Sequence, residues 1–293
     1  MMGVPASTRV VVITGASTGI GAACALMCVA QGMTVFAGVR TDEAGEALRQ
    51  RGGERLIPIR LDVTDSESIR QAERVVRETV GLTGVNGLVN NAGIAVGSPL
   101  EVIPIEALRR QLEVNVIGQI LVTQAFLPLL RLARGRIVNM GSIAGRGTIP
   151  VMGPYSASKH ALEALTDALR LELQPWGLHV SIVEPGAIAT PIWEKSTETG
   201  NEIAAAAGPA AVALYADLVS RVKDRIAQAA NRAIPADVVA QTVLHALTAA
   251  KPKTRYLVGS DAKVRAVMLR WFPDRVQDWI LTKVLALPAW NSK

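Results

Sequence analysis

Two side chains four residues apart, Tyr155 and Lys159, are the first candidates for chemistry in this sequence. They fall in the stretch 154–173, whose apolar positions repeat with helical spacing, so both lie on one helix face with Cβ atoms about 6 Å apart. A free tyrosine has a pKa of about 10, and a nearby ammonium lowers it by favouring the phenolate. The pair predicts a hydroxyl that acts as an acid or base near neutral pH, although the same spacing also describes a helix face in solvent.

Two further polar residues occupy positions that suit a functional site. Ser142 follows the apolar run 135–140 in a glycine-flanked turn, where a serine often serves only the turn. Asn115 lies in the middle of the long helical stretch 105–132, and its neighbours are apolar. Because asparagine has poor helix propensity and is usually exposed in helices, this context predicts a partly buried Asn115 with a specific role.

Short apolar runs alternate with helical patterns along most of the chain, which predicts an α/β fold with a parallel sheet. No linker, repeat or low-complexity segment divides it, so we expect one domain with a Rossmann-type doubly wound sheet over residues 1–260. A looser stretch at 187–234 is the expected lid, and 261–293 is an apolar extension. Strands are expected at 9–14, 34–39, 55–61, 87–90, 135–140, 179–184 and 255–258, and helices at 43–51, 66–80, 105–132, 154–173 and 236–250.

The glycine-rich segment Gly15-Ala16-Ser17-Thr18-Gly19-Ile20-Gly21 joins the first expected strand to a helix that ends near Gly32. Glycines let the backbone turn tightly and approach a ligand, and a helix N-terminus attracts phosphate. The spacing differs from the G-x-G-x-x-G fingerprint, and a simple strand-to-helix turn stays open. Its place after the first apolar strand favours a dinucleotide cofactor.

The end of the second expected strand bears on which dinucleotide binds. NAD-binding proteins usually have an acidic residue there, whereas this chain has Val39 followed by Arg40, which suits the 2′-phosphate of NADP. Asp42 and Glu43 lie nearby and weaken this preference. At the ends of later strands, Asp62 is placed to reach an adenine and Asn91-Ala92-Gly93 to line the ligand crevice.

Composition narrows the classes of protein to which this chain could belong. The chain has 293 residues, 49% hydrophobic and 19% charged, and its net charge of +6 is dispersed rather than clustered with aromatics, which argues against nucleic-acid binding. Cys24 and Cys28 share one expected helix and suit two buried thiols in a cytoplasmic protein. Three scattered histidines suggest no metal site, and we expect neither a secretory signal nor a membrane span.

The segment 261–293 carries Trp271, Phe272, Trp279 and Trp290 among basic residues. Such an amphipathic stripe usually packs onto its own domain or covers a substrate pocket. Contact with a membrane surface is the alternative.

Taken in order, these motifs resemble those of the short-chain dehydrogenase/reductase family over roughly residues 9–260. Several stretches, among them VFAGVRT, GLVNNAGI and VSIVEPGAIATPIW, are most similar to its retinol and hydroxysteroid dehydrogenase branch. The resemblance rests on the following motifs: Thr14–Gly21, Asn90-Asn91-Ala92-Gly93, Asn115, Ser142, Tyr155-x-x-x-Lys159 and Pro185-Gly186.

The resemblance implies a role for each matching residue. Tyr155 would be the general acid or base, Lys159 would lower its pKa and bind the nicotinamide ribose, Ser142 would hold the substrate oxygen, and Asn115 would keep a water in a proton relay. Thr190 matches a position that contacts the carboxamide. The implied cofactor-binding set comprises Gly15, Ser17, Thr18, Gly19, Ile20, Arg40, Asp62, Val63, Asn91, Ala92, Gly93, Tyr155, Lys159, Pro185, Gly186, Ile188 and Thr190.

We therefore expect an oxidoreductase that transfers a hydride between NADP(H), or less favourably NAD(H), and a bulky apolar alcohol or ketone such as a steroid or retinoid. Alternatives are a 3-oxoacyl thioester reductase and a non-catalytic nucleotide-binding regulator. The resemblance also implies a homodimer or homotetramer built on the helices at 105–132 and 154–173.

Overall fold

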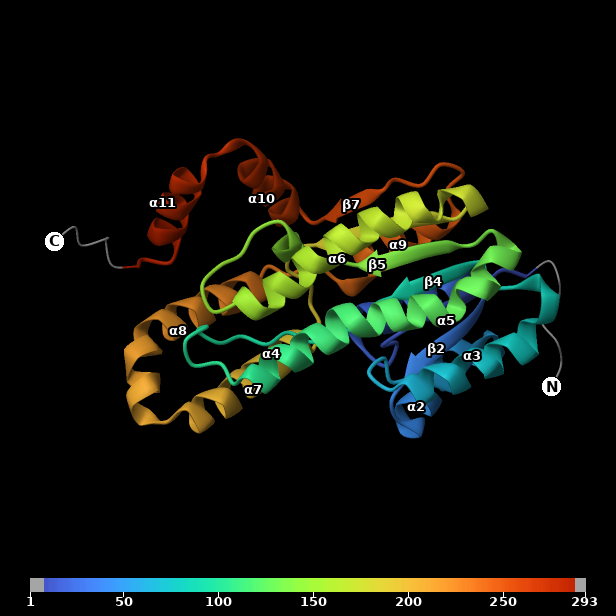
Figure 1. The fold of residues 1–293 in the computed structure, drawn as a ribbon, viewed down its shortest axis with the longest axis horizontal. Helices are drawn as coiled ribbons and strands as arrows, with labels where there is room; N and C mark the ends of the chain where they lie inside the picture. The colour runs from blue at the N-terminus through green and yellow to red at the C-terminus, as the bar shows by residue number, and fades with distance from the viewer. Residues whose placement is uncertain (1–7, 288–293) are drawn as a thin grey trace.

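A computed structural model, which describes residues 8–287, contains one sheet of seven parallel strands (Figure 1). The strands are β1 (Val10–Ile13), β2 (Thr34–Val39), β3 (Leu56–Arg60), β4 (Gly87–Asn90), β5 (Arg136–Met140), β6 (His179–Pro185) and β7 (Arg255–Val258). Their order across the sheet is β3-β2-β1-β4-β5-β6-β7, and every neighbouring pair is parallel. This confirms the expected Rossmann-type fold class.

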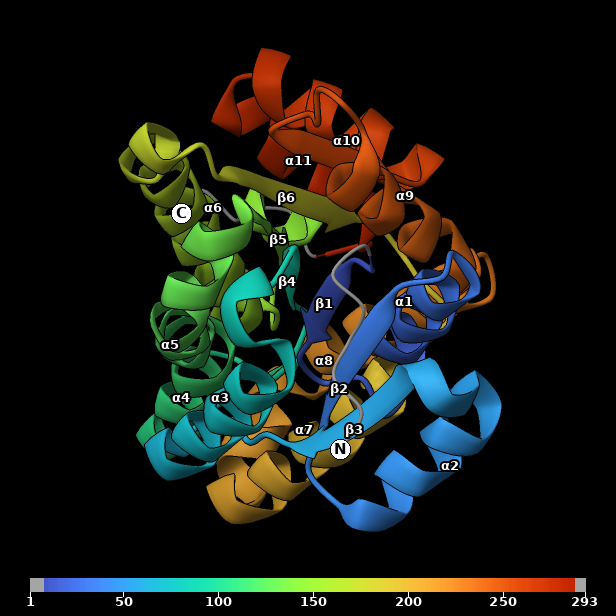
Figure 2. The ribbon, with the colours of Figure 1, turned by 90° about the vertical axis from the view of Figure 1, so that its right-hand side faces the viewer.

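Helices cover both faces of the sheet (Figure 2). One face carries α1, α2 and α9, and the other carries α3, α4, α5 and α6. The bounds are α1 (Gly19–Ala30), α2 (Asp42–Gly52), α3 (Ser66–Val80), α4 (Ile105–Leu112), α5 (Gly118–Ala133), α6 (Gly153–Glu172), α7 (Ile192–Ala207), α8 (Pro209–Ala230), α9 (Ala236–Thr248), α10 (Ser260–Trp271) and α11 (Asp274–Val284).

Strand alternation builds two cores. On β1, Val11 and Ile13 belong to the core under α1 and α9, whereas Val10 and Val12 belong to the core under α3 and α5. Successive side chains of a strand point to opposite faces, so a strand buried on both faces reads as a continuous apolar run. Cys24 and Cys28 lie fully inside the first core as free thiols, as expected.

The strand order creates a switch point between β1 and β4. The chain runs outward from β1 through β2 to β3 and then returns to place β4 on the other side of β1. In open parallel sheets, ligands bind in the crevice outside the carboxyl ends of the strands at such a point. The glycine-rich loop after β1 and Asn91 after β4 therefore meet there.

The long helix expected at 105–132 is interrupted. Between α4 and α5 the residues Glu113–Ile117 form a π-helical turn that contains Asn115. The whole stretch Ile105–Ala133 is long and apolar enough, by length and composition, to cross a membrane, with a mean hydropathy of 1.6 over 18 residues. In this fold α5 packs on the sheet, where Val122 and Phe126 are fully buried, as the core helix of a globular domain does.

The expected lid and the expected C-terminal extension both form helices. The 187–234 stretch contains α7 and α8, which join at Gly208 and extend beyond the carboxyl ends of the strands (Figure 1). In the 261–293 segment, Ala262 and Ala266 of α10 pack against Ile143, while the Trp279 side chain of α11 is 62% exposed. Trp290 lies outside the described residues.

Candidate active site

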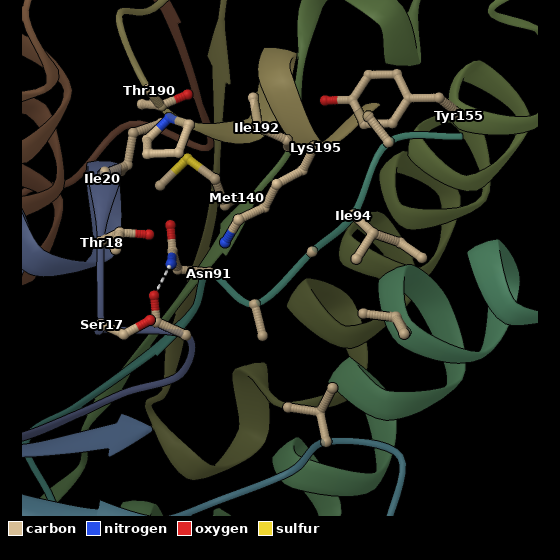
Figure 3. A pocket seen from close by; sticks show the side chains of 18 of the residues that line it. Ser17, Thr18, Ile20, Asn91, Ile94, Met140, Tyr155, Thr190, Ile192 and Lys195 are labelled. Carbon is tan, nitrogen blue, oxygen red and sulfur yellow. Dashed lines mark hydrogen bonds between the residues drawn. The ribbon is translucent and has the colours of Figure 1, made fainter. Parts of the chain in front are cut away.

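A cleft of about 640 Å³ opens at the carboxyl ends of the strands. The predicted cofactor-binding residues all line it, and so do Ser142, Tyr155 and Lys159, although their roles stay predictions. In Figure 3, Ser17, Thr18 and Ile20 line one side of the cleft, and the Tyr155 hydroxyl points into it from the other. Asn115 is the predicted site residue that does not line the cleft; it lies beneath it.

The glycine loop brings the backbone close to the ligand space. Gly15 has φ +61°, and a Cβ there would come within 2.8 Å of the Cα of Ala92. Gly19, at φ +57°, would meet Thr190 at 3.1 Å. Within the described residues, no side chain caps the first turn of α1 and no acidic residue lies in it. Its N–H groups are therefore free for an anion, and the loop fits a dinucleotide pyrophosphate.

Asn91 ties the two sides of the switch point together. Its Nδ2 donates to the carbonyl oxygens of Thr14 and Gly15, each at 3.0 Å. In return, the hydroxyl oxygen of Thr14 accepts from the backbone N–H groups of Asn91 and Ala92, each at 2.9 Å. These bonds hold the segment after β4 against the glycine loop.

Charged side chains of both signs line the cleft, namely Arg40, Arg109 and Arg110 together with Asp62, Glu106 and Glu113. Arg40 lines it at the end of β2 with an exposed side chain, and Arg110 lines it from α4. Between them, Asp62 accepts from the N–H and the hydroxyl of Thr64 at 2.9 and 2.7 Å. Burial opposes ionisation of Asp62, but these hydrogen bonds and the charges of Arg40 and Arg110 outweigh it and lower its pKa.

Tyr155 and Ser142 meet across the cleft from different elements. Tyr155 is in the first turn of α6, Ser142 follows β5, and both side chains line the cleft near each other. Burial raises the pKa of the Tyr155 hydroxyl above its ordinary value, and the Ser142 hydrogen bond only partly opposes this. The net shift is upward because desolvation of the phenolate dominates, and the expected lowering of this pKa by Lys159 stays a prediction. Tyr155 is accordingly a neutral phenol at physiological pH.

Lys159 is buried one turn further along α6. Its Nζ lies 5.7 Å from the centroid of the Tyr155 ring and donates to the carbonyl oxygen of Met140 at 2.7 Å. Burial lowers the pKa of Lys159 to about 8 because the ammonium loses hydration, while Glu163, when it is ionised, acts the other way. The lysine can therefore gain or lose a proton close to neutral pH.

Asn115 positions the loop after β4. The side chain is fully buried, and its Oδ1 accepts from the N–H of Ile94 at 2.8 Å. Its Nδ2 donates to the carbonyl of Ile94 at 2.9 Å and to the hydroxyl of Ser158 at 3.1 Å. The π-helical turn presents the asparagine inward, and such turns recur at functional sites. The expected burial of Asn115 is confirmed.

The wall nearest Tyr155 is apolar. Ile94, Met140, Ile192 and Trp193 contribute to it, and the indole N–H of Trp193 donates to the carbonyl of Ile188 at 2.9 Å, which fixes the ring. Lys195, on the first turn of α7, extends its amine into the cleft (Figure 3). Such walls fit apolar ligands with a few polar groups to orient them.

Sequence reasoning missed the contributions of α4 and α7. Arg109 and Arg110 on α4 have the spacing of a solvated helix face, and no local signal separates them from other surface arginines. A signal for the α7 residues was present in the sequence. The apolar and aromatic residues Ile192 and Trp193, and then Lys195, come shortly after Thr190, which was predicted to line the cofactor site. Between residues 8 and 287, no group of three His, Cys, Asp or Glu side chains is arranged for a metal.

Fold and cleft together define a nucleotide-binding protein of the Rossmann class with a tyrosine, a serine and a lysine converging beside the ligand space. Residues 9–201 match the family described as short chain dehydrogenase, and the chain belongs to the short-chain dehydrogenase/reductase family. It is an NAD(P)-dependent oxidoreductase that acts on alcohol or carbonyl groups.

Relatives place the chain more narrowly. It is 36% identical over 282 residues to an NADPH-dependent 3-dehydrocapnine reductase of Ornithobacterium rhinotracheale, covering 94% of this chain and 97% of the relative. It is 40% identical to retinol dehydrogenase 5 of Mus musculus, covering 97% and 91%, and 40% identical to 17-beta-hydroxysteroid dehydrogenase type 6 of Bos taurus, covering 96% and 90%. These likenesses confirm the retinol and hydroxysteroid branch.

A solved structure agrees with this assignment. A short chain dehydrogenase from Burkholderia cenocepacia, in complex with NADP, superposes with a TM-score of 0.72 at 28% identity. The alignment covers 97% of this chain and all of that one.

Proposed function

We propose that this protein transfers a hydride between NADP(H) and the hydroxyl or carbonyl group of a bulky apolar substrate, with Tyr155 as the general acid or base. The observation that carries the proposal is the convergence of Tyr155, Ser142 and Lys159 in one cleft opposite a glycine loop with a free helix N-terminus. The nicotinamide cofactor supplies or accepts the hydride when bound, and the protein supplies alignment and a proton.

Each polar residue has a distinct task in this proposal. The neutral Tyr155 donates its proton to the substrate oxygen during reduction, since burial favours the protonated phenol. Ser142 donates a hydrogen bond to the same oxygen, where negative charge develops. The Lys159 ammonium, held on the Met140 carbonyl, stabilises the phenolate that is left, and its pKa near 8 allows it to pass a proton on. Asn115 acts by holding the Ile94 loop.

The preference for NADP(H) is supported by Arg40 and Arg110, which line the cleft near Asp62 and could bind a 2′-phosphate. Val39 occupies the position at which NAD-binding proteins usually carry an acid. The name of one relative specifies NADPH dependence, and the Burkholderia structure was determined with NADP.

A bulky apolar substrate is supported by the wall of Ile94, Met140, Ile192 and Trp193 beside Tyr155. The relatives' names mention retinol, a hydroxysteroid and 3-dehydrocapnine, and each sets a candidate class for this chain. The helices α7 and α8 extend over this side of the cleft and form the proposed substrate lid. Tyr215 of α8 hydrogen-bonds Glu101 in the loop after β4, which joins the lid to the domain.

The proposal is tested with a panel of retinoids, steroids, long-chain amino ketones, acyl thioesters and small ketones, each with NADPH and NADH. We expect the highest kcat/KM with NADPH and a long apolar ketone. Preferential turnover of 3-oxoacyl thioesters would favour the thioester reductase instead, and tight NADPH binding without turnover would favour a regulator.

Replacing Tyr155 with Phe tests the acid. We expect kcat to fall by about 10²–10⁴-fold while the Kd for NADPH changes less than about twofold, because only the proton donor is lost. Tryptophan fluorescence quenching measures the cofactor affinity in the same preparation. A variant that keeps most of its turnover would refute the assigned role.

Association and location are proposed as well. Ile117, Leu132 and Leu171 are 45%, 54% and 60% exposed on the faces of the π-helical turn, α5 and α6 where the family resemblance places the interface of a homodimer or homotetramer. Sedimentation of Leu171→Glu checks this, and an unchanged mass would count against it.

We propose that the enzyme is cytoplasmic. The alternative is that the exposed side chains of Trp271 and Trp279 contact a membrane, and flotation with lipid vesicles tests it.

A further inference from the structure

A second cluster of charged side chains lies behind the catalytic face of α6. Glu184, the residue before Pro185 on β6, is fully buried, and its two carboxylate oxygens accept from Nε and Nη2 of Arg146 at 2.5 and 2.7 Å. Arg146 directly follows the short helical turn Ile143–Gly145 after Ser142. The pair therefore joins the loop of Ser142 to the strand end that leads to the Pro185-Gly186 turn of the cleft.

Glu163 extends this cluster to α6. It lies one turn after Lys159 and is 13% exposed, and its Oε2 accepts from Nε of Arg255 on β7 at 3.2 Å. Its Oε1 is buried and has no donor among the described residues. The carboxylate of Glu184 lies near the Glu163 carboxyl group, because both belong to the cluster of Arg146 and Arg255, and it acts on Glu163 through its charge and as a hydrogen-bond acceptor. Two carboxylates cannot both be ionised at such a contact without a donor between them, so one proton must be shared.

We propose that Glu163 is a positioning residue for the reaction: as a neutral acid it donates a hydrogen bond to Glu184 and so fixes α6 against the Ser142 loop and the Pro185-Gly186 turn. The inference rests on the proposed roles of Ser142 and Lys159. Close packing between α6 and the Ser142 loop supports this proposal. A Cβ on Gly145 would lie 3.0 Å from the Lys159 carbonyl oxygen and 3.2 Å from Cγ of Glu163. The turn after Ser142 thus sits directly on α6 at these two residues.

The surroundings explain which carboxyl keeps the proton. Glu184 has two short bonds from one guanidinium, whereas Glu163 has one longer bond from Arg255, which also binds Asp167 at 2.6 Å. Burial and the neighbouring Glu184 charge raise the pKa of Glu163 to about 8, against the opposing charges of Arg255 and Arg146. The titratable and charged groups around Glu163 are Lys159 and Asp167 on α6, Arg146, Glu184 on β6 and Arg255 on β7.

The hydrogen bond from Glu163 to Glu184 is therefore lost at alkaline pH. Above pH about 8 Glu163 ionises, the hydrogen bond becomes a repulsive contact between two carboxylates, and α6 loses its fastening to the Ser142 loop. The Glu163→Gln variant provides the matched comparison. Its amide nitrogen can donate to Glu184 while its oxygen accepts from Arg255, and it carries no ionisable proton.

Infrared difference spectroscopy of the wild type against Glu163→Gln tests whether Glu163 is protonated, and it needs no turnover. At pH 7 we expect the C=O stretch of a neutral carboxylic acid in the wild type only, and its loss as the pH rises through about 8. Absence of that band at pH 7 would overturn the proposal. Because the measurement needs neither substrate nor cofactor, it stands even if the proposed function fails.

Kinetics then test positioning. We expect Glu163→Ala to lower kcat at pH 7 by about ten- to a hundredfold through misalignment, and Glu163→Gln to restore it to within about twofold. At pH 9 the wild type should lose activity relative to Glu163→Gln. The control is Glu172→Gln, which removes an exposed carboxylate at the far end of α6 and should leave the pH profile unchanged. If Glu163→Gln is as impaired as Glu163→Ala, or keeps the wild-type alkaline decline, Glu163 has no such role.

Discussion

Replacing Asn115 with alanine is expected to weaken both stability and cofactor affinity. The side chain is fully buried and makes three hydrogen bonds, two of them to the backbone of Ile94. Ile94 in turn lines the cleft, so the same bonds that stabilise the fold also shape the site. The π-helical turn has no other side chain that reaches this backbone.

The magnitude follows from the groups left without partners. After truncation, the N–H of Ile94 loses its acceptor, while its carbonyl keeps only the 3.0 Å bond from Gln111. Each buried polar group that loses its partner costs about 1–3 kcal/mol, so the expected loss is about 2–5 kcal/mol including the small cavity. Ser158 remains bonded to the Tyr155 carbonyl at 2.6 Å and adds little. A loss of this size is a large part of a typical domain stability of about 5–15 kcal/mol.

Urea unfolding followed by circular dichroism measures the free energy of unfolding of each variant. Gln50→Ala, an exposed polar truncation on α2, serves as the control and should stay within about 0.5 kcal/mol of the wild type. The Kd for NADPH is measured on the same samples, and we expect it to rise for Asn115→Ala alone.

A loss below about 1 kcal/mol for Asn115→Ala would refute the reasoning, because the Ile94 backbone would then have found other partners. An unchanged Kd together with the full loss of stability would show that the Ile94 loop does not shape the cofactor site. The two readouts therefore separate the structural claim from the functional one.

Two further predictions concern charge. Arg40→Ala should weaken NADPH binding about tenfold or more and leave NADH binding unchanged, because only NADPH carries the 2′-phosphate. The control is Arg51→Ala on the outer face of α2. Equal effects on the binding of both cofactors would contradict the assignment of Arg40 to the 2′-phosphate. For Lys159, the folded pKa of about 8 lies below the ordinary 10.5, so between these pH values the unfolded chain binds the extra proton. The free energy of unfolding of the wild type relative to Lys159→Met should therefore rise from pH 8 to 10.5, by at most about 1.4 kcal/mol per pH unit, and urea titrations showing no slope would exclude a depressed pKa.

The sequence alone determined the α/β class, the strand positions, the family, and the candidate set around Tyr155 and Lys159. These features are local. A strand buried on both faces reads as a continuous apolar run, a helix reads as a 3.6-residue repeat, and the glycine loop is specified by adjacent residues with positive φ at Gly15 and Gly19. Such signals need no knowledge of what lies across the fold.

Only the tertiary structure decided how the site is electrostatically tuned. The direction in which the Tyr155 pKa is shifted depends on burial, which the spacing of residues in the sequence does not reveal. The carboxyl pair behind the site joins Glu163 to Glu184, and Arg255 reaches Glu163 across 92 residues of sequence. Long-range contacts of this kind arise because parallel strands bring distant segments to one edge of a sheet, where desolvation sets the charge of each group.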